Sequence, residues 1–428
     1  MEACLSYKRM IPVRGEEFGC FLKKFRLRNQ KTFLKGVGMK KYNNSGMYVK
    51  TIFTTFTLLF ILFVQSAIAA EPINVCYTTD FSGPTANIGI VQSKIVQMVV
   101  KNVNDGGGIK GRPINLITTD NGADPSKAIG NAKMFKDQYK CKVMLADITS
   151  SSVMALKGWG EANKIPMITA APQSDKLIDV DKKSWLFRTC APAALNVQAA
   201  LARIKKLGYT KVAFEGTSVA FGTDTLATAK RYAPQYGITI VHEVLCEPKT
   251  KDLTIQVKQM KASGAEAILS AEYEAETAVL ARAISAIGWK PYVLATSAAD
   301  LNSALPLAEP KVYEGWETVS MADPTKPLVK KIWRDAKAFA KGTRIDEDEK
   351  AIRAYDQISL LVEALKATKN LEDSESIRDG FYNIDKNYER AAGKKGGKGG
   401  FTTAKNHLLD VSDIVVFKVK NAKITPLD

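Results

Sequence analysis

Residues 105–128 read DGGGIKGRPINLITTDNGADPSKA, and the order of elements in this stretch decides the fold class. Its glycines, with Lys110 and Arg112, have the composition of a phosphate-binding loop, but such a loop follows a strand and opens a helix. Here the glycines follow a helical pattern and precede a strand at 113–121. We therefore interpret Gly106–Gly108 as a chain reversal that stops the helix at left-handed φ and binds no ligand.

Helix and strand patterns alternate along most of the chain. A strand ends at Asp80, a helix with apolar residues at helical spacing follows it, and another helix begins at Pro125 with Asp124 as its N-cap. The alternation restarts after Arg188 with four more helix–strand pairs. This order predicts parallel sheets covered by helices on both faces, and its restart predicts two lobes. Ligands of such sheets bind outside the carboxyl ends of the strands, here in the loops after residues 79, 148, 169, 216, 271 and 295.

The net charge divides unevenly along the chain. The 428 residues carry a formal charge of +17, and twelve Lys and Arg against three Glu place +9 of it in residues 1–70. The other +8 is spread rather than clustered, so a nucleic-acid partner is not expected. The length and the composition, with 46% apolar and 25% charged residues, are those of a globular chain of two domains.

Residues 51–70, TIFTTFTLLFILFVQSAIAA, follow a lysine-bearing lead. Such a lead, a short apolar run and small residues before the cut are the features of a secretory signal peptide, and the run falls short of the roughly 20 apolar residues of a membrane span. We expect a cleaved signal peptide in residues 1–70, cut at or near the Ala70–Glu71 bond, and a periplasmic protein. Because the lead is long when counted from Met1, translation from Met39 or Met47 is the alternative start.

Four cysteines follow residue 70, namely Cys76, Cys141, Cys190 and Cys246, and in an oxidising compartment they permit two disulfides. We expect a Cys190–Cys246 bond, because Cys190 begins the second-lobe segment and Cys246 ends a strand that faces the same side. Cys76 and Cys141 lie in or next to neighbouring strands, and four free buried thiols are the alternative. The cysteine spacing matches no metal motif, and His242 and His407 stand alone, so neither a metal nor another cofactor is expected.

Seven segments together resemble the periplasmic leucine/isoleucine/valine-binding protein family, the solute receptors of branched-chain-amino-acid-type ABC importers. The resemblance runs in order through residues 71–428, in the segments FSGPTANIG, VNDGGGIKGRPINLITTDNGADPSKA, ITSSSVMAL, IPMITAAPQSDKL, WLFRTCAP, GYTKVAFEGTSVAFGTD and IGWKPYVLATS. It implies a type I periplasmic binding protein fold, in which two Rossmann-like lobes joined by a three-strand hinge close on a ligand. The implied limits are 71–191 with 318–405 for lobe 1, and 192–317 with 406–428 for lobe 2.

The same resemblance implies a function and its partners. It implies a monomeric solute-binding protein that passes a small-molecule ligand to the permease subunits of an ABC transporter in the inner membrane. A ligand-sensing module for a separate membrane receptor uses the same fold and is the alternative. No nucleophile elbow or metal-ligand set is present, so an enzyme is not expected.

Candidate ligand-binding residues follow from the resemblance, and five of them belong to the first lobe. Ser150 and Ser151 match the family loop that holds a ligand carboxylate through hydroxyl and backbone N–H groups at a helix N-terminus. The same serines would also serve as plain helix caps. Ala171 and Gln173 match the other first-lobe ligand loop, and Ile88 stands where amino-acid binders often carry an aromatic residue.

The second lobe supplies the remaining candidates. Phe221 and Tyr273 match positions that cover the ligand from this lobe. Ser297 stands where an acidic residue commonly pairs with the ligand's ammonium group, and Glu272 or Glu274 is the candidate substitute. Because a buried ammonium without a carboxylate is costly, the ligand class stays open among an amino acid, an amide and a small carboxylic or aromatic acid.

Overall fold

The structure, a computed structural model, describes residues 71–299, 301–347 and 349–427. The expected signal peptide and the alternative start sites lie outside these residues. Two sheets, each covered by helices on both faces, form two lobes, which confirms the predicted α/β class. None of the helices in the described residues combines the length and the apolar character needed to cross a membrane.

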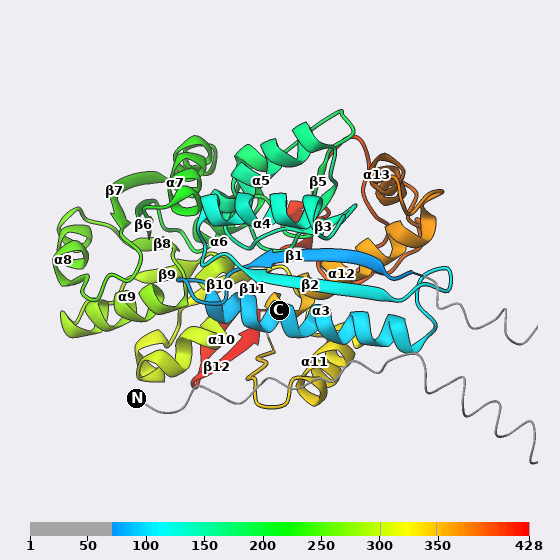
Figure 1. Cartoon of the computed structure of the whole chain (residues 1–428). Coiled ribbons are helices and arrows are strands. Elements are labelled where there is room, and N and C mark those ends of the chain that lie inside the picture. The colour runs from blue at the N-terminus through cyan, green and yellow to red at the C-terminus, as the bar shows by residue number, and fades with distance from the viewer. Residues whose placement is uncertain (1–70, 300, 348, 428) are drawn as a thin grey trace, which may run out of the picture. The chain divides into compact units, whose positions relative to one another are not determined.

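The first lobe contains a five-stranded parallel sheet in the order β2-β1-β3-β4-β5 (Figure 1). Side chains alternate between its faces, so Val75 and Tyr77 of β1 pack with α3, α11, α12 and α13, whereas Cys76 packs with α4 and α5. The elements of this lobe are β1 (Ile73–Thr79), α3 (Ala86–Asp105), β2 (Ile114–Asp120), α4 (Pro125–Asp137), β3 (Met144–Leu145), α5 (Ser150–Asn163), β4 (Met167–Thr169), η1 (Asp175–Leu177), β5 (Leu186–Arg188), α11 (Pro327–Phe339), α12 (Glu349–Ala367) and α13 (Ser374–Tyr382).

The second lobe contains a seven-stranded sheet in the order β12-β11-β10-β9-β8-β6-β7. The strands from β10 to β7 are parallel, and β11 and β12 add an antiparallel hairpin whose turn residues Asn421 and Ala422 both have positive φ. The elements are α6 (Ala193–Lys206), β6 (Lys211–Thr217), α7 (Ala220–Tyr232), η2 (Ala233–Tyr236), β7 (Thr239–Cys246), α8 (Thr254–Ala262), β8 (Ala267–Ala271), α9 (Glu274–Ala286), β9 (Tyr292–Ala295), η3 (Ser297–Ala299), α10 (Leu301–Ala304), η4 (Leu305–Leu307), η5 (Pro310–Tyr313), β10 (Glu317–Ser320), η6 (Val411–Asp413), β11 (Val415–Lys420) and β12 (Lys423–Pro426).

The glycine-rich stretch reverses the chain between α3 and β2, as predicted. Gly107 and Gly108 have φ values of 94° and 74°, and a Cβ atom at Gly108 would lie 2.1 Å from the carbonyl oxygen of Arg112. Only glycine fits this close approach at positive φ. Gly106 keeps a negative φ of −81°, so the left-handed turn begins one residue later than predicted.

Contacts of individual residues mark where the chain passes between the lobes at two of the crossovers. β10, which ends at Ser320, is hydrogen-bonded within the second sheet, and Met321 is the first residue that packs in the first-lobe core. Near the C-terminus, the backbone N–H of Leu408 donates to the carbonyl oxygen of Arg188 in the first lobe (2.9 Å). The lobe limits of 71–191 with 318–405 and 192–317 with 406–428 stay a prediction.

The predicted Cys190–Cys246 disulfide is wrong. The structure pairs Cys76 of β1 with Cys141, which precedes the neighbouring strand β3, with 6.2 Å between their Cα atoms. Cys190 packs in a first-lobe core and Cys246 in a second-lobe core, and both are free and buried. Two strand ends that face the same side can still be too far apart for a disulfide. The bonded cysteines instead lie in or next to adjacent strands of one sheet.

Reduction of the Cys76–Cys141 bond is expected to lower the free energy of unfolding by about 4 kcal/mol, because the bond closes a long loop in the unfolded chain. Denaturant unfolding with and without reductant measures this difference. A Cys190→Ser variant is the control and should respond to reductant as the wild type does. An unchanged unfolding midpoint, or four free thiols on titration of the denatured, unreduced protein that begins near Glu71, would contradict the pairing.

Candidate functional site

Asp80 follows β1 and organises the loop that leads into α3. Its fully buried carboxylate accepts hydrogen bonds from the backbone N–H groups of Gly83 (2.5 Å) and Thr85 (2.8 Å) and from the Thr85 hydroxyl (2.7 Å). Gly89 allows α3 to approach the strand end, since a Cβ atom there would lie 1.9 Å from the Asp80 carbonyl oxygen. These contacts hold Thr85 and Ile88 at the carboxyl edge of the first sheet.

The serine run lies at the start of α5, at the same edge of the sheet. Ser150 is the first residue of this helix, and its hydroxyl accepts a hydrogen bond from the backbone N–H of Ser174 (3.2 Å). The N-cap residue is Thr149, and no side chain caps the helix, so the capping alternative for the serines is not observed. The Thr149 hydroxyl instead donates to Asp147 (2.9 Å), a carboxyl whose pKa is raised by burial.

Two buried arginines hold the loop that follows β4. Arg353 of α12 donates from Nη1 to the carbonyl oxygen of Ala170 (3.3 Å), and Arg188 of β5 donates from Nη2 to that of Pro172 (2.8 Å). Because the carbonyl oxygens point toward the arginines, the other side of the loop is presented to the space between the lobes. Ala171 and Gln173 lie in this loop.

Gln173 connects the two lobes. Its side-chain amide donates to the hydroxyl of Ser297 in η3 (2.8 Å), and its amide oxygen accepts from the side chain of Asn196 in α6 (2.8 Å). Both partners belong to the second lobe, and all three side chains are buried. Gln173 therefore serves as a contact between the lobes in this structure.

Two aromatic side chains cover this space from the second lobe. Phe221 in the first turn of α7 and Tyr273 just before α9 have ring centroids 5.7 Å apart. Gly222 lets α7 approach β6, since a Cβ atom there would lie 1.9 Å from the Thr217 carbonyl oxygen. Burial, and then the nearby Glu272 carboxylate, raise the pKa of Tyr273, so its hydroxyl keeps its proton.

These groups surround one cavity between the lobes, with about 330 Å³ of space between its lining atoms, part of it open to solvent. Apolar and aromatic groups dominate its wall, and Arg353 contributes the one charged side chain there. The lining residues are Thr85, Ile88, Ile148, Ser150, Ala171, Pro172, Gln173, Phe221, Tyr273, Ala298 and Arg353.

Six of the eight candidate residues from the sequence meet at this cavity. Two do not line it. Ser151 is half-buried in the first turn of α5, and Ser297 is turned toward Gln173 and toward a different cavity. Contact with a ligand stays a prediction for the other six, which are Ile88, Ser150, Ala171, Gln173, Phe221 and Tyr273.

Neither glutamate that was expected to replace the missing acidic residue faces this cavity. Glu274 forms an ion pair with Lys350 across the lobes (3.1 Å), and Glu272 is fully buried inside the second lobe beside Glu215. The lining residues, all within the described part of the chain, include no Asp or Glu. The electrostatic character of the wall therefore favours a negative group on a ligand over a positive one.

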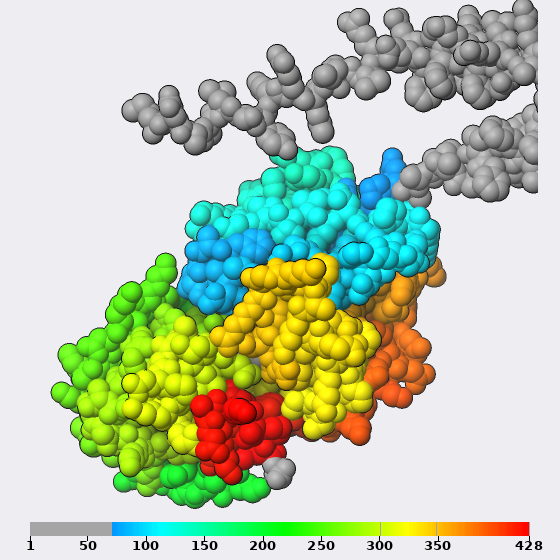
Figure 2. Space-filling model, turned by 90° about the horizontal axis from the view of Figure 1, so that it is seen from below, coloured from blue at the N-terminus to red at the C-terminus, as the bar shows by residue number. Residues whose placement is uncertain are grey.

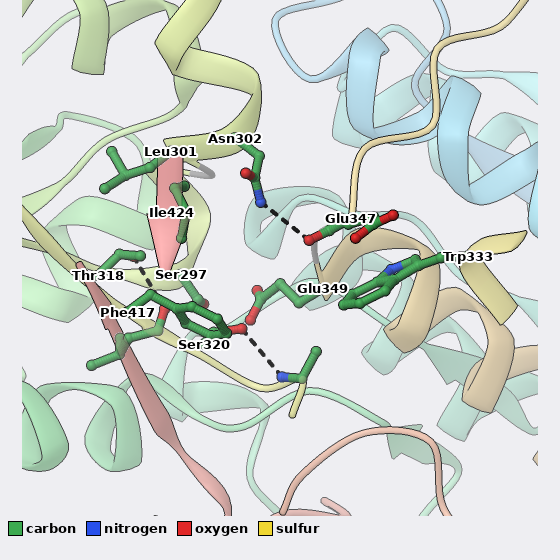
Figure 3. A pocket seen from close by; sticks show the side chains of 12 residues that line it. Ser297, Leu301, Asn302, Thr318, Ser320, Trp333, Glu347, Glu349, Phe417 and Ile424 are labelled. Carbon is green, nitrogen blue, oxygen red and sulfur yellow. Dashed lines mark hydrogen bonds between the residues drawn. The ribbon is translucent and has the colours of Figure 1, made fainter. Parts of the chain in front are cut away.

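A second cavity, with about 380 Å³ of free space, lies beside the hinge. Figure 3 shows Glu349 between the rings of Trp333 and Phe417, with Ser297 at one side. Glu349 already accepts a hydrogen bond from the Met321 backbone N–H (2.5 Å) and pairs with Arg353 (3.2 Å). In the space-filling view of Figure 2 the red C-terminal strands border yellow residues at this side of the molecule. Hinge segments, rather than strand-end loops of the first sheet, line this cavity, so we take the first cavity as the candidate ligand site.

Sequence reasoning missed five of the lining residues, and Arg353 is the charged one among them; the others are Thr85, Ile148, Pro172 and Ala298. The implied lobe limits place residues 350–365, KAIRAYDQISLLVEAL, in the first lobe, and none of them was a candidate ligand-binding residue. The polar residues at 349, 353, 356 and 357 recur every three or four positions, and all are buried. Charged residues at helical spacing on the buried face of an otherwise apolar helix were the available signal.

The family model of the periplasmic binding proteins matches residues 72–423. Leu/Ile/Val-binding protein homolog 3 of Brucella melitensis is 24% identical over 298 residues, which are 69% of this chain and 79% of that relative. Leu/Ile/Val-binding protein homolog 7 of Brucella abortus is 22% identical over 49% of this chain and 55% of its own length.

Solved structures share the fold. A type 1 periplasmic binding protein from Bordetella pertussis Tohama I superimposes with a TM-score of 0.75 at 18% identity, over 83% of this chain and 99% of that one. The substrate-binding protein LivJ from Streptococcus pneumoniae, in complex with isoleucine, gives a TM-score of 0.72 at 19% identity, over 82% of this chain and 97% of that one. At such identities the likeness establishes the type I fold and leaves the ligand open.

Gly222→Ala is expected to lower the free energy of unfolding by about 1–3 kcal/mol, because its Cβ atom pushes α7 away from β6. Gly158→Ala in α5 is the matched control. Nothing lies within 4 Å of its added Cβ atom, so it should raise stability by up to about 1 kcal/mol. Urea unfolding of both variants checks this, and equal stabilities would show that the close approach under Phe221 is absent.

Proposed function

Because this chain belongs to the periplasmic binding protein family, we propose that it captures a small organic acid between its lobes and delivers it to an ABC importer. One observation carries the choice of ligand. Arg353 lines the cavity, and its buried Nε–H group has no acceptor among the described residues. A buried donor left without a partner costs about 1–3 kcal/mol, and a ligand carboxylate would supply the acceptor.

The rest of the wall fits the two ends of such a ligand. Ser150 lies at the N-terminus of α5, where a hydroxyl, backbone N–H groups and the helix dipole all favour an anion. Ile88, Phe221 and Tyr273 offer apolar surface for the remainder of the molecule. Micromolar affinity corresponds to about −8 kcal/mol, which a few hydrogen bonds of about 0.5–3 kcal/mol each do not reach, so apolar burial must contribute.

Contacts on one side of the cavity support capture by closure of the lobes. Asp224 of α7 accepts a hydrogen bond from the Ser174 hydroxyl and pairs with Lys176 (2.7 Å). Asp175 accepts a hydrogen bond from Thr228 of α7 (2.8 Å). These pairs join the loop after β4 in the first lobe to α7 in the second, and they would separate if the lobes opened.

The other side of the cavity carries a second set of contacts between the lobes. Lys350 of α12 pairs with Glu274 of α9 (3.1 Å) and donates to Ser303 (2.6 Å), and Asn87 of α3 also donates to Glu274 (3.5 Å). Closure thus buries charged and polar groups on both flanks of the ligand. The hinge between them is formed by the three crossovers.

An α-amino acid is the second candidate ligand, since the LivJ neighbour holds isoleucine in the same fold. Such a ligand brings an ammonium group, and the cavity wall offers hydroxyl and carbonyl oxygens for it but no carboxylate. We therefore rank carboxylates without an ammonium group first.

Calorimetric titration of the exported protein with a panel of aliphatic and aromatic carboxylates tests the ligand class. The tightest carboxylate should bind at least about tenfold more strongly than its amide, because the amide loses the charge-assisted hydrogen bonds. Its 2-amino derivative should bind no more strongly than the parent acid. Binding of the 2-amino derivatives alone would reject the organic-acid assignment. The closure mechanism is tested separately, by the variants described below.

Ser150→Ala and Phe221→Ala are expected to weaken binding of the tightest carboxylate by about 5- to 30-fold each, since each removes about 1–2 kcal/mol from opposite sides of the ligand. Ser150→Ala should leave the free energy of unfolding nearly unchanged. Phe221 also packs in a second-lobe core, so Phe221→Ala should lower the free energy of unfolding by about 3–5 kcal/mol, and its affinity is measured well below its unfolding midpoint. Affinities within twofold of wild type for both variants would place the site elsewhere.

Asp224→Asn is expected to weaken ligand binding about three- to tenfold, because it removes contacts that exist only when the lobes are closed and so lowers the closed population. The matched control is Asp105→Asn, whose exposed pair with Lys101 lies within the first lobe. That control should leave affinity unchanged. Equal affinities of the two variants would contradict a role of Asp224 in closure.

A further inference from the structure

A second group of potential ligand atoms lies inside the second lobe, outside the cavity between the lobes. Carboxylate oxygens of Glu215 and Glu272 and the Sγ atom of Cys246 all lie within 4.8 Å of one another. None of these residues lines the candidate ligand site. Glu215 and Glu272 are 0% exposed and Cys246 is 5% exposed.

Three neighbouring parallel strands bring these atoms together. Glu215 lies in β6, Cys246 ends β7, and Glu272 directly follows β8, and these strands adjoin in the order β8-β6-β7. Parallel strands that end at one edge place residues distant in sequence side by side. Cysteine spacing therefore gave no metal motif, because two of the three candidate ligands are glutamates on other strands.

Neither carboxylate has a Lys or Arg partner among the described residues. Both oxygens of Glu272 and one of Glu215 are buried without a well-formed hydrogen bond, and the two carboxyl groups lie within hydrogen-bond reach of one another. The second oxygen of Glu215 accepts from the Ser270 hydroxyl (2.8 Å), which fixes the orientation of that carboxylate. Burying a carboxylate without a positive partner is costly, so such a group binds either a proton or a cation.

We propose that Glu215, Cys246 and Glu272 bind a divalent zinc-like metal ion at the carboxyl edge of the second-lobe sheet. Zinc accepts carboxylate oxygens at about 2.0–2.2 Å and thiolate at about 2.3 Å. Tetrahedral geometry at these bond lengths separates the ligand atoms by about 3.3–3.7 Å, so small side-chain rotations suffice to close the present spacing. The thiol favours zinc over calcium or magnesium, which prefer oxygen ligands alone.

The position of Glu215, Cys246 and Glu272 would let an ion reach them from the surface and would give the ion a structural role. The loop that follows Cys246 carries exposed residues at 247, 249 and 251, so the thiol lies just under the surface. Glu272 precedes Tyr273, whose ring lines the candidate ligand site. A bound ion would tie the ends of β6, β7 and β8 together directly behind that ring.

Protons are the competing occupants. Burial and then the neighbouring carboxylates raise the pKa of Glu272, and burial raises the pKa of Glu215, so without an ion the pair holds at least one proton near neutral pH. A carboxyl–carboxylate hydrogen bond would then hold the two glutamates together. The experiment must therefore detect the ion at the thiol itself.

Titration of the chelator-treated, exported protein with Zn²⁺ should show one site per chain, with affinity at least tenfold lower in Cys246→Ser and in Glu272→Gln. Co²⁺ in place of Zn²⁺ should give a thiolate-to-metal charge-transfer band in the wild type. Ser270→Ala should reduce affinity about 10- to 100-fold, as loss of a hydrogen bond to a metal ligand does. Cys190→Ser, which removes the other buried free thiol, is the matched control and should bind as the wild type does.

Absence of the charge-transfer band, or equal affinity in Cys246→Ser and Cys190→Ser, would overturn the site and leave the protonated pair. If a variant fails to fold, the wild type alone decides. Zn²⁺ should then protect one of the two free thiols from alkylation, identified by mass spectrometry as Cys246, and equal labelling of both would reject the proposal. These titrations contain no organic ligand, so their outcome is independent of the proposed transport function.

Discussion

The geometry of parallel strands governs everything that meets at the cavity. In a parallel sheet each strand is followed by a helix, so strand ends, loops and helix N-termini gather at one edge. In this chain two such edges face one another, with Asp80, Ser150 and the loop at 170–174 on one and Phe221 and Tyr273 on the other. The N–H groups and hydroxyls at this edge are suited to a negative ligand group, and the aromatic rings opposite them are suited to an apolar body.

Much of the fold and of the cavity wall could be predicted from the sequence, because both depend on the local order of strands, loops and helices. The alternation of strands and helices gave the two lobes, and the N-cap at Asp124 is observed with hydrogen bonds to the N–H groups of residues 126 and 127. Loop positions in a parallel sheet follow from strand order alone, so six of the eight candidate residues meet at one cavity. The reversal at Gly107 and Gly108 was likewise a local property, decided by backbone conformation.

The rest depends on contacts between segments that are distant in sequence. Cys76 and Cys141 were placed in or next to neighbouring strands, but the distance between their Cα atoms, which decides whether they can bond, does not follow from strand patterns. Ser297 was predicted to contact the ligand, but its hydroxyl accepts a hydrogen bond from the side chain of Gln173 in the other lobe. Arg353 reaches the cavity from a helix and lies 183 residues further along the chain than Ala170, whose carbonyl oxygen it binds, and its role follows from burial rather than from any motif.

The two lobes differ in how their buried charged groups are compensated. In the second lobe, Glu215 and Glu272 have no Lys or Arg partner among the described residues. In the first lobe Arg353 is partly compensated by Glu349 and keeps one N–H group without an acceptor beside the cavity.

The central claim is that this N–H group of Arg353 binds a ligand carboxylate. A crystal structure of the protein that begins near Glu71, with its tightest-binding carboxylate, tests the claim most directly. The account predicts the carboxylate within hydrogen-bond distance of Ser150 and Arg353, with the apolar body against Phe221 and Tyr273. A ligand in the cavity between Trp333 and Phe417, or one whose polar group avoids Arg353, would contradict it.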